Sequence, residues 1–436
     1  MSKTFAELPL RPETIEALHA HGFIAPFAIQ EMVLPIALSD GDVIGQAKTG
    51  TGKTLAFGVP VIERVIAPND AEWANFEHKG MPQVLIVVPT RELCTQVTKD
   101  IEELASNRGI RTLAVYGGRA FEPQIEALQA GIEIVVGTPG RLLDLSRQGQ
   151  LRLKQVSRLV LDEADEMLNM GFYEDITDIL SHTPDEKSTW LFSATMPKEV
   201  SNIAKKFMYD PIEITVGNKN ESTSNVSHEY YLVNARDRYQ ALKRLADAHP
   251  DIFSVIFCRT KRDTQKVAEN LIESGYSAGA LHGDLSQNQR DLVMKSFRNK
   301  QIQMLVATDV AARGIDVDDI THVINYQLPD EIETYTHRSG RTARAGSEGS
   351  ALTFLTPDDR SMWNSINKLI DPNFKPAPSG LRRDSKSKRR GKGPNNKKRK
   401  ARDEKRSFGK GRHDRSSSFR GKSKSYGKGR SDKPSR

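Results

Sequence analysis

The stretch Ala47-Lys48-Thr49-Gly50-Thr51-Gly52-Lys53-Thr54 decides the fold, because it joins a β-rich run, 42–47, to an apolar helical pattern. Its glycines let backbone N–H groups approach phosphate oxygens, and the start of a helix favours an anion. Lys53 is then placed to reach the β- and γ-phosphates of a nucleotide, and the Thr54 hydroxyl to ligate Mg²⁺. Residues 47–54 therefore predict a phosphate-binding loop after a strand. Ala47 stands where the strict pattern has Gly, and a chance Gly-rich turn is the competing interpretation.

Short apolar runs alternate with helical patterns on both sides of this loop, for example the helical patterns 92–106 and 123–130. The runs expected as strands are 42–47, 84–89, 112–117, 133–137, 158–162, 190–193 and 212–216. After the polar segment 217–225, the alternation restarts with 228–233, 254–259, 278–282, 303–308, 322–326 and 351–355. Near-continuous apolar strands between helices are typical of a doubly wound parallel sheet with both faces covered. We therefore expect an α/β protein with two such domains, 1–217 and 227–371, a linker at 218–226 and a tail at 372–436.

Charge is divided unevenly along the 436 residues, whose formal net charge is +8. Residues 381–436 contain 24 Lys or Arg and five Asp or Glu, a charge of +19 that leaves −11 for residues 1–380. So polar and basic a segment cannot bury enough apolar surface to fold, and we expect a disordered tail that binds an anionic polymer. A solvated, solubilising extension is the alternative.

Several classes of protein are excluded by simpler features. Two cysteines, Cys94 and Cys258, cannot form a disulfide framework or a zinc site of four cysteines. No apolar run approaches the roughly 18 residues of a membrane span, and the start of the chain lacks the pattern of a signal peptide. We expect a cytoplasmic protein.

The run Asp162-Glu163-Ala164-Asp165 ends an apolar strand. Carboxylates at the carboxyl end of such a strand lie beside a phosphate-binding loop in this kind of sheet. Asp162 is placed to hold Mg²⁺ through water, and Glu163 to orient and deprotonate an attacking water. A solvated helix start is the alternative interpretation.

Together these residues resemble the DEAD-box family of RNA helicases, whose fold is a pair of RecA-like domains, and the resemblance covers roughly residues 5–370. The first domain supplies the matching motifs Pro89-Thr90-Arg91-Glu92-Leu93, Gly117-Gly118, Thr138-Pro139-Gly140-Arg141 and Ser193-Ala194-Thr195. The second supplies Gln287-x-x-Arg290, Ala307-Thr308-Asp309, Arg313-Gly314-Ile315-Asp316 and the decapeptide from His337 to Gly346.

The resemblance implies that ATP with Mg²⁺ contacts both domains. It assigns Phe5 to stacking on adenine, Gln30 to the adenine edge, Asp316 to the ribose, and Arg341 and Arg344 to the γ-phosphate as arginine fingers. Phe27 stands where the family usually has Thr or Ser, so a hydroxyl hydrogen bond is missing. Gln30 still predicts adenine selectivity, and whether Phe27 loosens it stays open at this point.

The resemblance also implies an RNA site made for the backbone rather than the bases. Its residues would be Thr90, Arg91, Gly117, Gly118, Thr138, Gly140, Arg141, Arg259, Gln287, Arg290 and Thr308. Such cations, polar side chains and backbone N–H groups contact phosphate and sugar and carry little sequence information. His337 would couple the second domain to Asp165, Ser193 and Thr195.

The predicted function is that of an ATP-dependent RNA helicase of the general-purpose bacterial kind. RNA-stimulated hydrolysis of ATP would separate short duplexes and remodel RNA–protein particles during ribosome assembly or RNA decay. We expect a monomer. An RNA-annealing or clamping protein whose ATPase times release is the main alternative, and a DNA helicase is a third.

Overall fold

The structure, a computed structural model, describes residues 4–47, 51–216, 226–312, 315, 317, 319–343, 348–370 and 374. Most of the predicted linker and tail therefore lie outside the described residues. So do Lys48, Thr49 and Gly50 of the phosphate-binding loop, Asp316, and Arg344. We call residues 4–216 the first lobe and residues 226–370 the second lobe.

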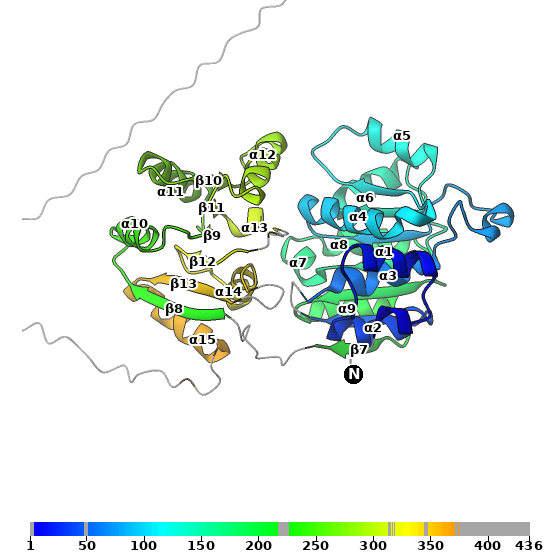
Figure 1. Ribbon diagram of the computed structural model, residues 1–436, viewed down its shortest axis with the longest axis horizontal. Helices are drawn as coiled ribbons and strands as arrows, with labels where there is room; N and C mark the ends of the chain where they lie inside the picture. The colour runs from blue at the N-terminus through cyan, green and yellow to red at the C-terminus, as the bar shows by residue number, and fades with distance from the viewer. Residues whose placement is uncertain are drawn as a thin grey trace, which may run out of the picture. The chain divides into compact units, whose positions relative to one another are not determined.

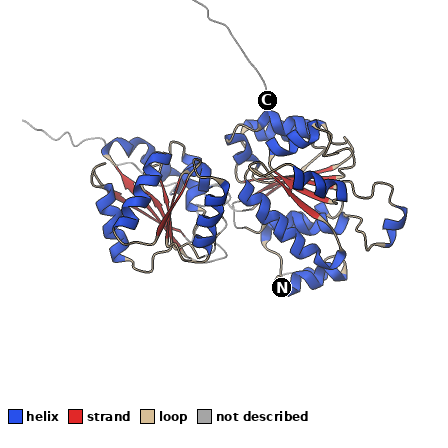
Figure 2. Ribbon diagram, turned by 90° about the horizontal axis from the view of Figure 1, so that it is seen from above, coloured by secondary structure: helices blue, strands red, loops and turns tan. Residues whose placement is uncertain are grey.

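The first lobe is built on a sheet of parallel strands. Among the described residues it contains seven, in the order β3-β4-β2-β5-β6-β1-β7. Their bounds are β1 Val43–Gln46, β2 Val84–Val87, β3 Thr112–Val115, β4 Ile134–Gly137, β5 Arg158–Leu161, β6 Ser188–Ser193 and β7 Ile212–Thr215. Every predicted strand of this lobe is present, and the inner strands β2, β4 and β6 are buried along their whole length because helices cover both faces (Figure 2).

Helices pack on both faces of this sheet. They are α1 Pro12–Ala20, α2 Ala28–Ala37, α3 Lys53–Arg64, α4 Arg91–Ala105, α5 Glu122–Ala130, α6 Pro139–Arg147, α7 Ala164–Asn169, α8 Tyr173–Ser181 and α9 Lys198–Phe207 (Figure 1). Alternate strand residues enter two separate apolar clusters: Ile86 and Val160 belong to one, and Leu85 and Leu159 to the other. This period of two is what a strand buried on both faces requires.

The second lobe repeats the architecture on a smaller scale. Its described strands form a parallel sheet in the order β10-β11-β9-β12-β13-β8. They are β8 Val226–Leu232, β9 Ser254–Phe257, β10 Ala278–Leu281, β11 Met304–Ala307, β12 His322–Asn325 and β13 Gly349–Leu355. The helices are α10 Arg238–Ala248, α11 Lys261–Glu273, α12 Gln287–Arg298, α13 Asp309–Ala312, α14 Ile332–Ser339 and α15 Arg360–Ile370 (Figure 1). None of the described helices has the length and apolarity needed to cross a membrane.

Strand order determines where chemistry can occur in the first lobe. Strands β5, β6 and β1 are neighbours in the sheet and run in the same direction. Their carboxyl ends therefore meet at one edge. The phosphate-binding loop follows β1, Asp162 follows β5, and Ser193 ends β6. Three segments far apart in the sequence are thus brought to one place.

Candidate nucleotide and RNA site

In the described part of the phosphate-binding loop, the Lys53 side chain contacts the backbone of the loop itself. This lysine begins α3, is buried, and donates from Nζ to the Ala47 carbonyl at 3.1 Å. Gly52 adopts φ +85° as the N-cap of α3, a conformation that favours glycine. A Cβ on Gly52 would also overlap Gln30 Nε2 and Phe27 Cδ2. Thr51 and Thr54 are half-buried beside it.

Gln30 links the adenine-reading segment to the phosphate-binding loop. Its Oε1 accepts from the Phe27 backbone N–H at 2.8 Å, and its Nε2 donates to the Gly52 carbonyl at 2.9 Å. The Phe27 ring lies over Gly52 and is more than half exposed. Both partners of the Gln30 amide are backbone groups. The amide is therefore fixed even though residue 27 has no hydroxyl.

Phe5, the predicted partner of adenine, is buried in the first lobe. The ring has no exposed surface and belongs to the same apolar cluster as Leu18 and Ile29. Stacking of Phe5 on adenine stays a prediction of the resemblance. The structure assigns Phe5 to the core under α1, where its backbone N–H donates to the Ile24 carbonyl.

Two buried carboxylates stand at the end of β5. Asp162 accepts the backbone N–H of Glu163 at 2.9 Å, and burial raises the pKa of Asp162 to about 6 against the opposing charge of Lys53. Glu163 has φ +52° and ψ +49°, left-handed values that cost a side-chain-bearing residue of the order of 1 kcal/mol. Its Oε2 is buried and has no hydrogen-bond partner among the described residues. A strained acid with an unused oxygen suits a group that acts on a ligand.

The last residue of the Asp162–Asp165 run is tied to the end of β6. Asp165 accepts from both the backbone N–H and the hydroxyl of Thr195, each at 2.8 Å. The hydroxyl of Ser193 accepts from the Asp165 backbone N–H and donates to the Thr195 carbonyl. The three predicted coupling residues of the first lobe therefore form one network.

His337, the fourth predicted coupling residue, takes a different partner from the predicted ones. Its Nδ1 pairs with Glu166 Oε1, one residue beyond Asp165. Burial alone would lower the pKa of His337, but the hydrogen bond and charge of Glu166 outweigh it and the pKa is raised. Glu166 was not predicted from the sequence, although its place next to Asp165 offered a signal.

Arg341 lies in the second lobe, on the segment that follows α14. It is buried, and its guanidinium donates to the carbonyls of Ile315 and His337. No carboxylate within 4.0 Å neutralises it among the described residues. The positive charge is therefore available to an anion.

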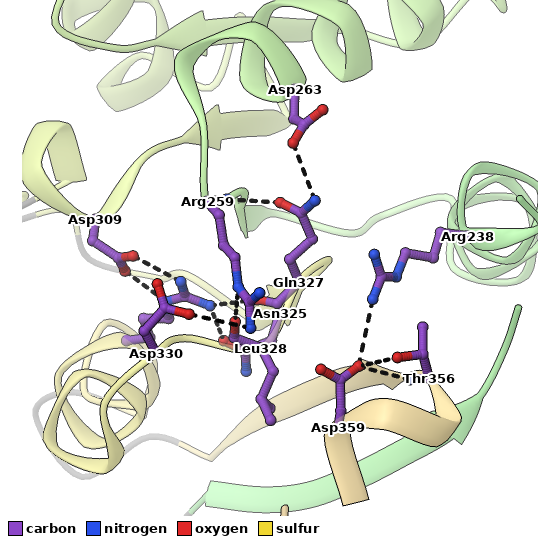
Figure 3. A network of polar contacts seen from close by, with 11 residues as sticks. Arg238, Arg259, Asp263, Asp309, Asn325, Gln327, Leu328, Asp330, Thr356 and Asp359 are labelled. Atoms are coloured by element: carbon purple, nitrogen blue, oxygen red, sulfur yellow. Dashed lines mark hydrogen bonds and ion pairs between the residues drawn. The ribbon is translucent and has the colours of Figure 1, made fainter. Parts of the chain in front are cut away.

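Arg338 supports this segment and was missed by sequence reasoning. Its Nε and Nη2 bind the two oxygens of Asp309 at 2.6 and 2.7 Å, and its Nη1 donates to Asn325 and to the Gln327 carbonyl. Figure 3 shows Asp309, Asn325 and Gln327 converging in this network. Arg338 thus joins α14, α13 and the end of β12, and the Arg-rich decapeptide was the signal for it.

The predicted RNA residues of the first lobe lie at the ends of neighbouring strands β2, β3 and β4. Thr90 caps α4, and Thr138 is the N-cap of α6. Gly118 has φ +85°, and a Cβ there would overlap the guanidinium of Arg91. Gly117 is the neighbour of Gly118, and Gly140 has open space where a Cβ would stand. Arg141 is buried and lies over the ring of Phe121.

The predicted RNA residues of the second lobe are mostly engaged by protein groups. Arg259 donates to the Leu328 carbonyl at 2.6 Å and pairs with Asp330 at 3.4 Å (Figure 3). Arg290 pairs with Glu92 at 2.7 Å, and Gln287 accepts from Arg91 at 2.6 Å. Thr308 is buried directly after β11. A bound anion would have to share or replace these contacts.

The sequence and the fold match known proteins along most of the chain. Residues 27–203 match the DEAD/DEAH box helicase family, and residues 237–346 match the helicase conserved C-terminal domain. The chain is 45% identical over 365 residues to the DEAD-box ATP-dependent RNA helicase CshA of Geobacillus kaustophilus, covering 84% of this chain and 76% of that protein. It is 43% identical to CshA of Bacillus subtilis, over 84% of this chain and 72% of that protein.

A solved structure, S. cerevisiae Dbp5 bound to RNA and ADP BeF3, has a TM-score of 0.76 and 30% identity. The match covers 85% of this chain and 94% of that one. With the motif residues at the strand ends and this likeness along most of its length, the chain belongs to the DEAD-box branch of the DEAD/DEAH box helicase family.

Proposed function

We propose that the protein is an ATP-dependent RNA helicase in which RNA-stimulated ATP hydrolysis is coupled to local separation of short duplexes. The observation that carries this proposal is Glu163. It is a buried, strained carboxylate with one oxygen that has no partner among the described residues, at the sheet edge that also holds Lys53 and Asp162. Its roles are to orient the attacking water and to accept the proton that the water loses.

The ATP site is assigned to residues of both lobes. Lys53 and the backbone of residues 47–52 hold the phosphates, and Gln30 reads the adenine edge. Arg341 and Arg344 supply positive charge as the γ-phosphate leaves, and Asp316 holds the ribose; Arg344 and Asp316 rest on the sequence alone. Guanidinium groups suit this task because they bind phosphate oxygens in pairs.

The donor set near Asp162 fits Mg²⁺, which prefers carboxylate, hydroxyl and water oxygens. Thr54 and Asp162 would hold the ion, whose charge would neutralise phosphate oxygens. The raised pKa of Asp162 supports the assignment. Burial disfavours the charged carboxylate, and a bound cation would stabilise it.

RNA binds, in this proposal, through its backbone to the residues at the ends of β2, β3, β4, β9 and β11. The similar protein S. cerevisiae Dbp5 was solved with RNA and ADP BeF3. ATP and RNA would each favour the same closed arrangement of the lobes, which couples their affinities reciprocally. Asp165, Ser193, Thr195 and His337, with Glu166, would carry that coupling.

The biological setting stays a prediction from sequence: a cytoplasmic monomer acting on RNA–protein particles in ribosome assembly or RNA decay. The domain limits 1–217 and 227–371 and the linker 218–226 are likewise proposals. An RNA clamp with ATP-timed release remains the second candidate, because the uncommitted charge of Arg341 serves either activity.

The test compares the full chain with its Glu163→Gln variant in three assays: ATP turnover with and without single-stranded RNA, ATP binding, and separation of a short RNA duplex. Glu163→Gln should lower kcat by about 10²- to 10⁴-fold, because a general base is lost, while ATP still binds. Glu126→Gln, the same change at an exposed position of α5, is the matched control.

Other outcomes select other functions. Near-normal turnover by Glu163→Gln would remove Glu163 from the role of base. RNA-stimulated turnover without strand separation would favour the clamp, and equal stimulation by DNA would favour a DNA helicase.

A further inference from the structure

Phe121 and Arg141 form a stacked pair, in which Arg141 is a predicted RNA residue and Phe121 has no role assigned by any motif. The guanidinium carbon of Arg141 lies over the ring of Phe121, 3.8 Å from its centroid. Phe121 directly precedes α5 and Arg141 lies in the first turn of α6, so two separate elements provide the pair. The ring is half-buried and packs on the apolar cluster that contains Val115 and Leu128. The core therefore fixes the ring, and the ring supports the arginine.

Arg141 is buried and forms no ion pair within the described part of the chain. Its Nη2 donates to the Arg119 carbonyl at 2.9 Å, and no carboxylate among the described residues pairs with it within 4.0 Å. Its Nη1 is buried and has no hydrogen-bond partner in the described part of the chain. Burial lowers the pKa of Arg141, with the charge of Asp144 opposing that effect and the charge of Arg91 adding to it. A buried cation in this state gains from an anion supplied by a ligand.

The surroundings of Arg141 favour that anion. A cation in the first turn of a helix is unfavourable, because the N-terminus carries positive partial charge. No side chain caps the N-terminus of α6, and Gly140 leaves open space where a Cβ would stand. A helix N-terminus without a side-chain cap, together with the Nη1 donor of Arg141, suits a phosphate group.

The ring has an advantage over a carboxylate as a support for this arginine. A carboxylate would orient the guanidinium but would also cancel its charge toward a phosphate. An aromatic face attracts the cation through its quadrupole and leaves the net charge in place. The ring also fixes a side chain that would otherwise lose rotamer freedom when RNA binds.

We propose that Phe121 is a positioning residue for RNA binding, whose ring holds the Arg141 guanidinium ready for a backbone phosphate. This inference rests on the proposed function, since the phosphate is taken to be that of the bound RNA strand. Phe121 acts through Arg141.

The test uses Phe121→Leu, which keeps apolar volume but loses the aromatic face, and Phe121→Tyr, which keeps the face. Phe172→Leu is the matched control, because Phe172 packs on the same cluster and no arginine lies over it among the described contacts. The readouts are KM for single-stranded RNA, kcat at saturating RNA, and melting temperature. Phe121→Leu should raise the RNA KM about three- to tenfold with kcat unchanged. Phe121→Tyr should restore the wild-type RNA KM, and Phe172→Leu should not change it.

A double-mutant cycle separates positioning from packing. Arg141→Gln should raise the RNA KM and reduce the slope of log affinity against log salt by about 0.7, the value for one lost phosphate contact on a single strand. In that background Phe121→Leu should cost nothing further. The inference would be overturned if Phe121→Leu raised the RNA KM by the same factor with and without Arg141, or if it left the RNA KM at the wild-type value. A wild-type chain without RNA-stimulated turnover would instead overturn the proposed function.

Discussion

At the scale of single residues, the amide of Gln30 predicts which base the site accepts. Its Oε1 accepts from the Phe27 N–H and its Nε2 donates to the Gly52 carbonyl, which fixes the amide. One acceptor position on Oε1 and one donor position on Nε2 remain for a ligand. These match adenine, which offers a donor at N6 and an acceptor at N7, whereas guanine would turn its O6 acceptor toward Oε1. We expect kcat/KM for ATP to exceed that for GTP by at least about tenfold, measured as competing turnover rates.

Phe27→Thr is the control for this prediction, because the group that orients Gln30 is the backbone N–H of residue 27 rather than its side chain. The ATP preference should stay, while the new hydroxyl can cap α2 and add about 1 kcal/mol of stability. Gln30→Ala should abolish the preference. Equal use of GTP by the wild-type chain would contradict this prediction, because it would mean that the Gln30 amide is not fixed. It would instead support a loss of adenine selectivity caused by Phe27.

At the scale of elements, the packing of β8 against α14 predicts how stability depends on pH. His228 on β8 contacts the Tyr335 hydroxyl on α14 at 2.9 Å, and burial lowers the pKa of His228 to about 4. The pKa of a histidine in an unfolded chain is about 6.5. Between about pH 6.5 and pH 4, His228 is therefore protonated in the unfolded chain and neutral in the folded one. This contribution is fully present above pH 6.5 and is lost as the pH falls toward 4, by about 3 kcal/mol at most.

The check is thermal unfolding of His228→Gln and wild-type chains between pH 4.5 and 7.5. The variant should be less stable at pH 7.5, because the ring contact is lost, and the difference in melting temperature should shrink as the pH falls. His19→Gln, at an exposed position of α1, is the matched control. A difference that stays constant with pH would show that His228 does not titrate across this interval.

Elements were the part of the structure that the sequence predicted best, since each predicted strand is present in a sheet. The differences from the prediction are at strand ends, for example at the first residues of two strands. Strand β6 starts at Ser188, two residues before the apolar run, because Ser188 and Thr189 are bonded to Asp40 and Asp42. Strand β8 starts at Val226, inside the predicted linker.

The site was predictable where it depends on strand ends and unpredictable where it depends on contacts between distant side chains. Lys53, Asp162 and Glu163 follow from the order of strands around a phosphate-binding loop. The Phe121–Arg141 stack and the burial of Phe5 depend on how helices from separate segments pack, which no local pattern contains. The role on adenine that the resemblance gives to Phe5 stays a prediction beside this burial.

At the scale of the whole molecule, the separation of charge predicts a division of labour in RNA binding. Residues 381–436 carry +19 and the rest of the chain carries −11, so the acidic body gains from a basic extension when it meets a polyanion. Each phosphate that a cation neutralises on a single strand adds about 0.7 to the salt slope of affinity. A chain that ends at Gly380 should therefore bind RNA more weakly and with a slope lower by several units, measured by titration at a series of salt concentrations. Replacing Phe408, Phe419 and Tyr426 with Ala should instead weaken binding without changing the slope, because stacking on bases releases no counterions. A truncated chain with the full slope would leave the tail as a solubilising extension and would place RNA affinity in the two lobes alone.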